Sequence, residues 1–378
     1  MLNRRECLLG TIGAGIVALG GDCIAAPEME PIRVALKRTV GTRGKVAGAV
    51  AVVIDEGDTS SVSYGSSGVP HVAWDAHTVF EIGSITKVMT ALMLADMAAR
   101  GEVAVGDAVS KYLPPSGALH EHGRPITLLD LASYSSGLPR WPGNFPPNWW
   151  DNPNPFAHYT ADKLYEFVSS YVPAYEPATH FAYSSLGYGL LGIALARRAG
   201  KSYEELLVER VCNPLGLERT RITLSPDMRK YLAQGHDLAL RSRLLWQFLP
   251  ALQGAGAARS DINDMTLFLK ACLGLVHTPL SGLFARLLET RRPTNVTGTD
   301  AGLGWFISSH EQDEIAWKSG LTGGFNTFVG FSTRRRRGAL VVSNFLWEPL
   351  DVGTTYMGMK FISPGFDPGD LSSLYLHD

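Results

Sequence analysis

The segment from residue 80 to residue 100 places the strongest constraint on the fold. Its sequence, FEIGSITKVMTALMLADMAAR, carries apolar residues at helical spacing and is followed by Gly101, a typical helix stop. The helix would be apolar on almost all sides, so we expect it to be buried. A chain of 378 residues is long enough to surround such a helix with other layers.

Two polar residues in the first turn of this helix, Ser84 and Lys87, indicate catalysis. They are three positions apart, which places hydroxyl and amine on one helical face. A serine becomes nucleophilic when a base takes its proton, and a buried lysine can be that base because desolvation lowers the pKa of an amine. The same spacing also occurs where serine is an N-cap and lysine is solvated, so the hypothesis needs partners elsewhere in the chain.

The order of the remaining segments predicts an α+β fold. Residues 48–55 and 60–64 read as a β-hairpin, and short apolar or aromatic runs after residue 302 read as an antiparallel meander. We expect hairpin and meander to share one antiparallel sheet flanked by helices. The sheet regions would be 27–79 and 302–378, beside a mainly helical region, 80–301. Helices are expected at 31–39, 107–112, 127–133, 161–171, 186–199, 203–211 and 261–273.

Residues 1–26 are interpreted as an export signal. Arg4 and Arg5 precede a mildly apolar run over residues 8–19, which is too short to span a membrane, and a small-residue stretch ends at 25–26. The arginine pair is similar to a twin-arginine signal, and the general export route is the alternative. We therefore expect a periplasmic or secreted protein in which residues 27–378 form a single catalytic domain.

Composition argues against several classes of partner. The formal net charge is −2, and the one basic run, residues 334–337, lies between two apolar runs, as a solvated hairpin turn would. We expect neither a nucleic-acid partner nor a stable membrane span. His120 and His122 have a spacing that metals use but no apparent third ligand, so neither a metal nor another cofactor is expected.

Two cysteines, Cys212 and Cys272, remain once the signal is removed. The predicted compartment permits a disulfide between them. Each lies in an apolar helical context, which equally suits two buried free thiols.

An unusual segment at residues 141–156, WPGNFPPNWWDNPNPF, contains five prolines and five aromatic residues. No regular element tolerates so many prolines, and the aromatic residues favour an ordered loop over disorder. We expect either a pocket wall or a structural clamp. Arg140 and Trp141, at its start, would lie on the rim of a cleft or on the surface.

Tyr183 and Lys318 are the candidate partners of the serine. Tyr183 precedes an apolar helix in FAYSSLGYGLLG, where a plain core tyrosine is the alternative. Lys318 lies in AWKSGLTGGFNTF, where a strand gives way to a glycine-rich turn that lets a ligand approach the backbone. An ordinary edge-strand lysine is the alternative there.

Four blocks in a fixed order carry a family resemblance: FEIGSITK, ITLLDLASYSSGLP, FAYSSLGYGLLG with PLGLERT after it, and WKSGLTGGFNTFVGF. The chain resembles the serine β-lactamase and penicillin-binding-protein superfamily over residues 46–344. It is similar to class C β-lactamases, near the class C-like DD-carboxypeptidases and endopeptidases. The resemblance implies a β-lactamase/transpeptidase-like fold.

The resemblance implies a role for each matching residue. Ser84 would be the acylated nucleophile, Lys87 would accept or relay its proton, and Tyr183 would be a phenolate or proton relay. Lys318 would attract the substrate carboxylate and hold down the pKa of the tyrosine.

Other matching residues would bind the substrate. Ser319 and Gly320 complete the K-T-G triplet, and the backbone N–H groups of Ser84 and Leu321 would form an oxyanion hole, which is typically worth about 3 kcal/mol per donor. Asn326 is a further candidate for contact with a substrate carboxylate that the resemblance does not supply, and a strand-end asparagine that caps a turn is the alternative.

Two residues depart from the family pattern. Ser185 replaces the asparagine of Y-x-N, so we expect an altered substrate preference rather than a dead site. Ser319 replaces threonine and keeps the hydroxyl. The absence of an S-D-N motif and of a class A deacylating glutamate favours class C-like chemistry.

The resemblance implies an exported serine hydrolase that opens β-lactam rings through an acyl-enzyme on Ser84. A D-Ala-D-Ala carboxypeptidase or endopeptidase acting on peptidoglycan stem peptides is the first alternative. A carboxylesterase is the second, and retention of Lys318 counts against it. A penicillin-binding sensor or scaffold that stays acylated is the third.

Overall fold

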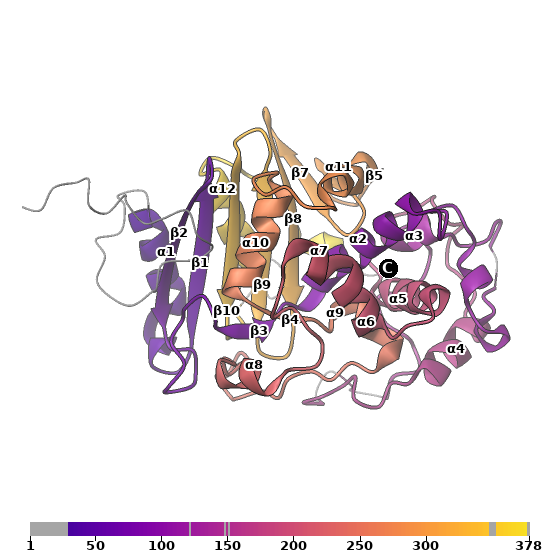
Figure 1. Ribbon diagram of the computed structural model, residues 1–378, viewed down its shortest axis with the longest axis horizontal. Coiled ribbons are helices and arrows are strands. Elements are labelled where there is room, and N and C mark those ends of the chain that lie inside the picture. Colours follow the sequence, from indigo (N-terminus) through magenta and orange to yellow (C-terminus); the bar gives the residue numbers. More distant parts are fainter. Residues whose placement is uncertain (1–28, 121, 147–148, 150–151, 348–352, 376–378) are drawn as a thin grey trace, which may run out of the picture.

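The structure, a computed structural model, describes residues 29–120, 122–146, 149, 152–347 and 353–375. It contains an antiparallel sheet of eight strands with helices against it and a helical region to one side (Figure 1). The predicted α+β class is confirmed. The predicted export signal, residues 1–26, lies outside the described residues.

The predicted pairing of early and late strands in one sheet is confirmed. Strand β1 of the N-terminal hairpin pairs with β10, so that Ala49 lies opposite Ser343. The strand order is β2-β1-β10-β9-β8-β7-β6-β5. The strands are β1 (Gly48–Asp55), β2 (Asp58–Gly65), β5 (Arg292–Pro293), β6 (Thr299–Ala301), β7 (Phe306–His310), β8 (Asp313–Leu321), β9 (Asn326–Ser332) and β10 (Arg337–Ser343).

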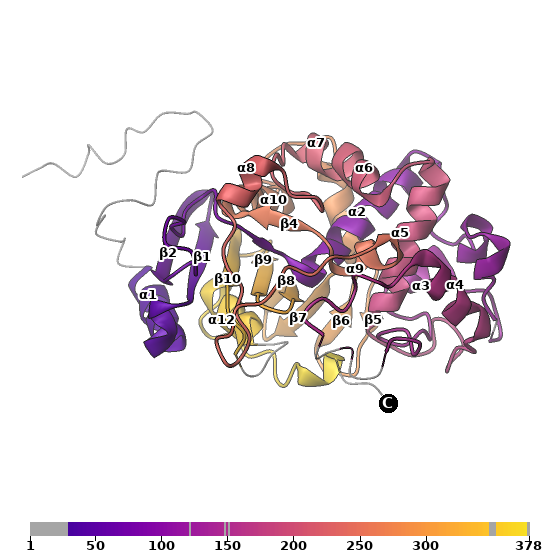
Figure 2. The same cartoon turned by 90° about the horizontal axis from the view of Figure 1, so that it is seen from below.

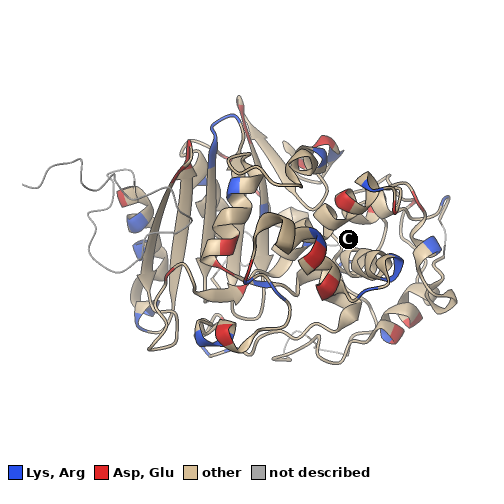
Figure 3. Cartoon of the chain, in the orientation of Figure 1, with Lys and Arg blue, Asp and Glu red and all other residues tan. Residues whose placement is uncertain are grey.

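Helices pack against both faces of this sheet. Gly338 of β10 meets Leu269 of α10 (Ile262–Cys272), whereas Phe328 of β9 meets Gly358 of α12 (Gly353–Ile362). Phe328 pairs with Val341, and residues 338 and 341 lie on opposite faces because side chains alternate along a strand. The central strands can therefore be apolar on both faces, and their ribbons in Figure 3 are almost free of charged residues.

Four short strands extend the prediction. Strands β5 and β6 belong to the main sheet although they lie before residue 302, the expected start of the C-terminal sheet region. Strands β3 (Val79–Glu81) and β4 (Arg259–Asp261) form a separate pair. Runs of two or three residues are too short to show an alternating pattern, so the sequence carries no signal for them.

The helical layers agree with most of the predicted ranges. The predicted capping pair is present at α3, where Thr127 and Asp130 bond reciprocally. The segment 107–112 forms only a 3₁₀ turn, Val109–Tyr112, and α6 continues as a π-helical turn, Val208–Cys212. The other helices are α1 (Glu30–Val40), α2 (Thr86–Ala99), α3 (Leu128–Ala132), α4 (Ala161–Ser170), α5 (Ser185–Ala199), α6 (Tyr203–Leu207), α7 (Asn213–Leu215), α8 (Pro226–Lys230), α9 (Gln253–Gly256) and α11 (Ser281–Glu289).

The predicted burial of the central helix is confirmed. Residues 86–97 of α2 are all buried, and α2 contacts α5, α6, α9 and α11 (Figures 1 and 2). The helix thus joins the sheet to the helical region, and its first turn lies at their junction.

Cys212 and Cys272 are buried free thiols, which decides between the two alternatives for them. Burial raises the pKa of Cys212 to about 12, so this thiol stays protonated and inert.

Three further sequence features can be located. Residues 334–336 of the basic run lie in the exposed turn between β9 and β10, and Arg337 is the first residue of β10. The His122 ring bonds the Pro173 carbonyl, and no group of three metal-ligating side chains occurs within the described ranges. No helix in the described part of the chain is long and apolar enough to cross a membrane.

Candidate active site

The start of α2 lies against the end of β8, and two glycines make this contact possible. Gly83 has φ +50°, and a Cβ atom there would lie 2.9 Å from the Leu321 nitrogen. A Cβ atom on Gly320 would lie 2.1 Å from the Ile82 carbonyl oxygen. Ser84 therefore lies in a 3₁₀ turn, Gly83–Ile85, before the α-helix begins at Thr86, which corrects the predicted helix start by two residues.

Ser84 and Lys87 form the predicted pair. The Lys87 Nζ atom donates to the Ser84 Oγ atom at 3.0 Å and is also 3.3 Å from the Ser185 Oγ atom. A third bond, 2.7 Å long, runs from Nζ to the main-chain carbonyl of Ala255. Lys87 has no exposed surface, so these contacts replace water around the amine.

Tyr183 lies immediately before α5, in the position that the cap of this helix fixes. The Ser184 Oγ atom accepts from the Gly187 nitrogen at 2.8 Å and donates to the Pro139 carbonyl at 2.7 Å. The Tyr183 ring centroid lies 5.1 Å from Lys87 Nζ and 4.4 Å from Lys318 Nζ. The phenol ring thus lies close to the Nζ atoms of both lysines.

Lys318 is completely buried beside aromatic rings. Its Nζ atom lies 4.4 Å from the Phe306 ring centroid and 5.0 Å from that of Tyr134. Tyr134 stacks on Tyr183 at 5.0 Å, and burial raises its pKa well above the usual value. Tyr134 therefore stays a neutral phenol. It supports the Tyr183 ring by packing against it and does not act as a base.

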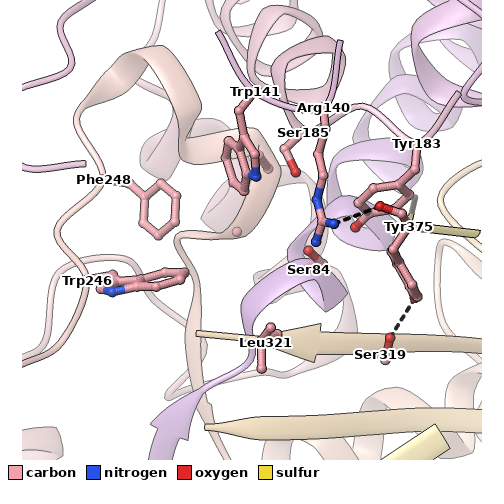
Figure 4. Close-up of a pocket in the computed structure, with 12 residues that line it drawn as sticks. Ser84, Arg140, Trp141, Tyr183, Ser185, Trp246, Phe248, Ser319, Leu321 and Tyr375 are labelled. Atoms are coloured by element: carbon pink, nitrogen blue, oxygen red, sulfur yellow. Dashed lines mark hydrogen bonds between the residues drawn. The ribbon is translucent and has the colours of Figure 1, made fainter. Parts of the chain in front are cut away.

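A small cavity of about 30 Å³ opens beside the Ser84 hydroxyl (Figure 4). Five predicted site residues line it: Ser84, Tyr183, Ser185, Ser319 and Leu321. Four others do not: Lys87, Lys318, Gly320 and Asn326.

The residues outside the cavity differ in what they contact. Lys87 and Lys318 touch lining residues from behind, and Gly320 packs on the backbone at Ile82. Asn326 is buried at the start of β9, opposite Leu321, and the structure does not bring it to the cavity.

The predicted loop at residues 141–156 contributes to the cavity. Arg140 and Trp141 line it, which favours the cleft-rim alternative for both. Phe156 stacks on Phe248 with ring centroids 4.2 Å apart. The loop thus lies beside the cavity as a wall, within its described residues.

The sequence interpretation missed three aromatic lining residues, Trp246, Phe248 and Tyr375. None of them belongs to one of the four sequence blocks. Trp246 and Phe248 lie in a stretch without regular periodicity, and Tyr375 lies close to the end of the chain. Only their size and apolar character marked them, and this is shared by many core residues.

This arrangement can perform acyl transfer. A hydroxyl with a lysine amine at 3.0 Å is a nucleophile next to a base. The turn after Gly83 and the end of β8 bring the backbone of Ser84 and Leu321 to one cavity, where two N–H donors could bind an oxyanion.

Known proteins are similar to this chain in sequence and in fold. The family model described as "Beta-lactamase" matches residues 35–355. The D-alanyl-D-alanine-carboxypeptidase/endopeptidase AmpH of Escherichia coli K12 is 30% identical over 78% of this chain and 78% of its own. A beta-lactamase of the same organism is 26% identical over 88% of this chain and 94% of its own.

Solved structures of similar fold carry the same family of names. A beta-lactamase/D-alanine carboxypeptidase from Yersinia pestis has a TM-score of 0.74 and 25% identity over 88% of this chain and 98% of its own. A class C beta lactamase from Rhodobacter sphaeroides has a TM-score of 0.73 over 87% and 99%, and at 22% identity it supports the fold alone. With a family model that spans most of its length and an AmpH relative at 30% identity, this chain belongs to the beta-lactamase family and is a class C-like serine hydrolase.

Proposed function

We propose that the protein opens β-lactam rings through an acyl-enzyme on Ser84. The observation that carries this proposal is the position of the Lys87 Nζ atom, which lies 3.0 Å from the Ser84 hydroxyl. The Lys87 side chain has no surface exposed to solvent. A buried amine at this distance can take the serine proton as the carbonyl is attacked.

Acylation would proceed as follows. Ser84 Oγ attacks the lactam carbonyl carbon while its proton passes to Lys87 or to the Tyr183 phenolate. The carbonyl oxygen becomes an oxyanion, which the N–H groups of Ser84 and Leu321 stabilise by about 3 kcal/mol per donor. The C–N bond then breaks, and the nitrogen takes up the proton that Ser84 released. Attack by water on the ester restores the free hydroxyl.

The substrate's anionic group would lie towards β8. Lys318, which is buried beside the Tyr183 ring, and Ser319 are adjacent along this strand, and Ser319 lines the cavity. We propose that the Lys318 amine is protonated. A charged group held at a cleft raises the local concentration of an ion of the opposite sign. We propose that Asn326 contributes to substrate binding from a greater distance. It pairs with Leu321, which lines the cavity.

A second function, D-Ala-D-Ala carboxypeptidase or endopeptidase activity on peptidoglycan, is supported by the AmpH relative. Acylation follows the same course with a peptide carbonyl, and the two functions differ in how fast water clears the β-lactam ester.

The variant Ser84→Ala tests the common chemistry. We expect it to lose all covalent labelling by a fluorescent penicillin, with a melting temperature within a few degrees of the parent. Ser169→Ala is the matched control, because this serine is exposed on α4 and bonds only within its helix. Undiminished labelling of Ser84→Ala would rule out Ser84 as the nucleophile.

Side-by-side turnover separates the substrates. Nitrocefin, a D-Ala-D-Ala peptide and p-nitrophenyl acetate should be compared at equal enzyme concentration. Steady nitrocefin turnover supports the β-lactamase, peptide turnover with a long-lived penicillin ester supports the peptidase, and turnover of the acetate alone supports an esterase. One acyl group per chain that is never released would indicate a sensor or scaffold.

We also propose export to the periplasm through residues 1–26, followed by a single catalytic domain, 27–378. The support is the arginine pair and the apolar run in the sequence. Replacing Arg4 and Arg5 together by lysine should leave the protein in the cytoplasmic fraction if the twin-arginine route is used. Unchanged fractionation would indicate the general route.

A further inference from the structure

The segment that follows α12 returns to the active site. It ends in a 3₁₀ turn, Ser372–Tyr375, and Figure 2 shows it crossing back from α12 towards the helical region. Tyr375 lines the cavity beside Ser84 and is only 6% exposed. A residue from the far end of the chain thus occupies part of the site that the family motifs build.

Tyr375 makes polar contacts with two residues of the site (Figure 4). Its hydroxyl lies 2.8 Å from the Ser319 Oγ atom, and its main-chain carbonyl accepts a bond from the Arg140 Nη1 atom at 2.9 Å. Its ring also meets the Tyr183 ring edge to face, with centroids 5.0 Å apart. These contacts occupy the hydroxyl of Ser319 and one donor of Arg140, and both residues line the cavity.

The turn is anchored but not part of a regular layer. The Asn295 side chain donates to the Ser373 carbonyl at 2.6 Å, and the Tyr356 hydroxyl accepts from the Leu371 nitrogen at 2.9 Å. Leu371 and Leu374 are buried. Local opening of the turn would expose these apolar side chains to water, so the open molecules form the minor fraction.

The space left beside Tyr375 is too small for a substrate. The cavity volume of about 30 Å³ has room for a few water molecules at most, whereas sites for drug-sized ligands measure roughly 300–1,000 Å³. A larger groove of about 650 Å³ is lined in part by Pro139, Asn295 and Ser373. Two residues of the same turn, Ser373 and Tyr375, thus line the groove and the cavity beside Ser84 respectively.

We propose that Tyr375 and its turn are an internal occupant of the active site that every substrate must displace. The inference rests on the function proposed above. Because only the open fraction of molecules binds, the apparent dissociation constant of any ligand equals its intrinsic value divided by that fraction. The occupant thus raises KM by the same factor for all substrates and leaves kcat unchanged.

The test compares KM for nitrocefin and for a D-Ala-D-Ala peptide in Tyr375→Phe and Tyr375→Ala, or the second-order acylation rate constant where turnover is slow. We expect Tyr375→Phe to lower KM about fivefold, the effect of one hydrogen bond. Tyr375→Ala, which also loses ring contacts, should lower it more than tenfold, with kcat within a factor of two. A control is Ser169→Ala, whose exposed side chain bonds only within α4 and should change nothing.

The sign of the change decides the proposal. A rise in KM would mean that Tyr375 contacts the substrate, and an unchanged KM would mean that the turn does not obstruct the site; either result overturns the proposal. A second measurement is amide hydrogen exchange in residues 371–375 of the unmodified protein. Acylation by a penicillin should speed exchange there, and unaltered exchange would contradict displacement.

Failure of this inference is distinguishable from failure of the proposed function. Acylation of both parent and Tyr375→Ala with equal rate constants rejects the internal occupant alone. Acylation of Tyr375→Ala but not of the parent supports both proposals. If neither protein is acylated by any β-lactam or cleaves any peptide, the proposed function is wrong and the inference falls with it.

Discussion

The Ser185 hydroxyl lies 3.3 Å from the Nζ atom of Lys87, on the position where the family pattern has an asparagine amide. This short side chain reaches the lysine from the first residue of α5, and it is buried. Having bonded the lysine, the hydroxyl cannot extend as far into the cavity as an amide would. Ser185 thus keeps the hydrogen bond to Lys87, but its side chain is too short to contact the substrate as an asparagine amide would.

Ser185→Asn should therefore raise cephalosporin turnover. An asparagine amide can contact both Lys87 and the amide carbonyl of the substrate side chain, and one added hydrogen bond of about 1 kcal/mol corresponds to about a fivefold gain in kcat/KM. Nitrocefin hydrolysis measures it. Ser185→Ala, which removes the contact with Lys87, is the matched comparison and should lower kcat/KM. No gain for Ser185→Asn would show that the departure does not limit turnover.

Lys87→Arg should slow acylation by at least about 10²-fold. Arginine keeps the positive charge but stays protonated, so it cannot take the Ser84 proton, and general-base catalysis contributes roughly 10²–10⁴. Stopped-flow acylation by a fluorescent penicillin measures the rate. Lys360→Arg, at an exposed position of α12, should acylate at the parental rate. Near-parental acylation of Lys87→Arg would assign the base to another residue.

Gly320→Ala should impair both stability and acylation. The new Cβ atom would lie 2.1 Å from the Ile82 carbonyl oxygen, so β8 must move away from the turn that carries Ser84. Overpacking of this kind costs about 1–3 kcal/mol, and a displacement of about 1 Å can cost 10²-fold in rate. Denaturant unfolding and penicillin labelling measure the two effects. Gly365→Ala, where nothing lies within 4 Å, should leave both parental.

Asp261→Asn should stabilise the protein at alkaline pH. Burial, together with the nearby charge of Asp264, raises the pKa of Asp261 from 3.8 to about 7. The folded state then holds a proton that the unfolded chain releases above about pH 4, so the parent's free energy of unfolding falls as pH rises from about 4 to about 7. Asparagine can still accept the N-cap bond that Asp264 donates to position 261.

The measurement is denaturant unfolding at pH 4.5 and pH 8. The variant should gain on the order of 1–2 kcal/mol at pH 8, which is less than the pKa shift implies because the contact with Arg219 at 3.7 Å is lost. The gain should shrink towards zero at pH 4.5. A gain that is equal at both pH values would show that Asp261 does not titrate in this window.

Much of the fold was predictable from local pattern. The apolar periodicity of residues 80–100 predicted a buried helix, and α2 is buried over residues 86–97. Alternating and β-branched runs predicted β1, β2 and β7 to β10, because they are long enough to show a period. Strands β3 to β6 were missed because two or three residues carry no period, and tertiary pairing alone makes them strands.

The sequence by itself predicted the candidate site: a serine and a lysine one helical turn apart, and the motif residues Tyr183 and Lys318. In the structure both lysine Nζ atoms lie beside the Tyr183 ring. These residues are recognisable because acyl transfer restricts which side chains can stand at each place. The tertiary structure alone decided how open the site is. Tyr375 lies 56 positions after Ser319 and belongs to no motif, yet its hydroxyl lies 2.8 Å from the Oγ atom of that serine. Contacts between distant segments depend on how whole layers pack, and no local pattern encodes them.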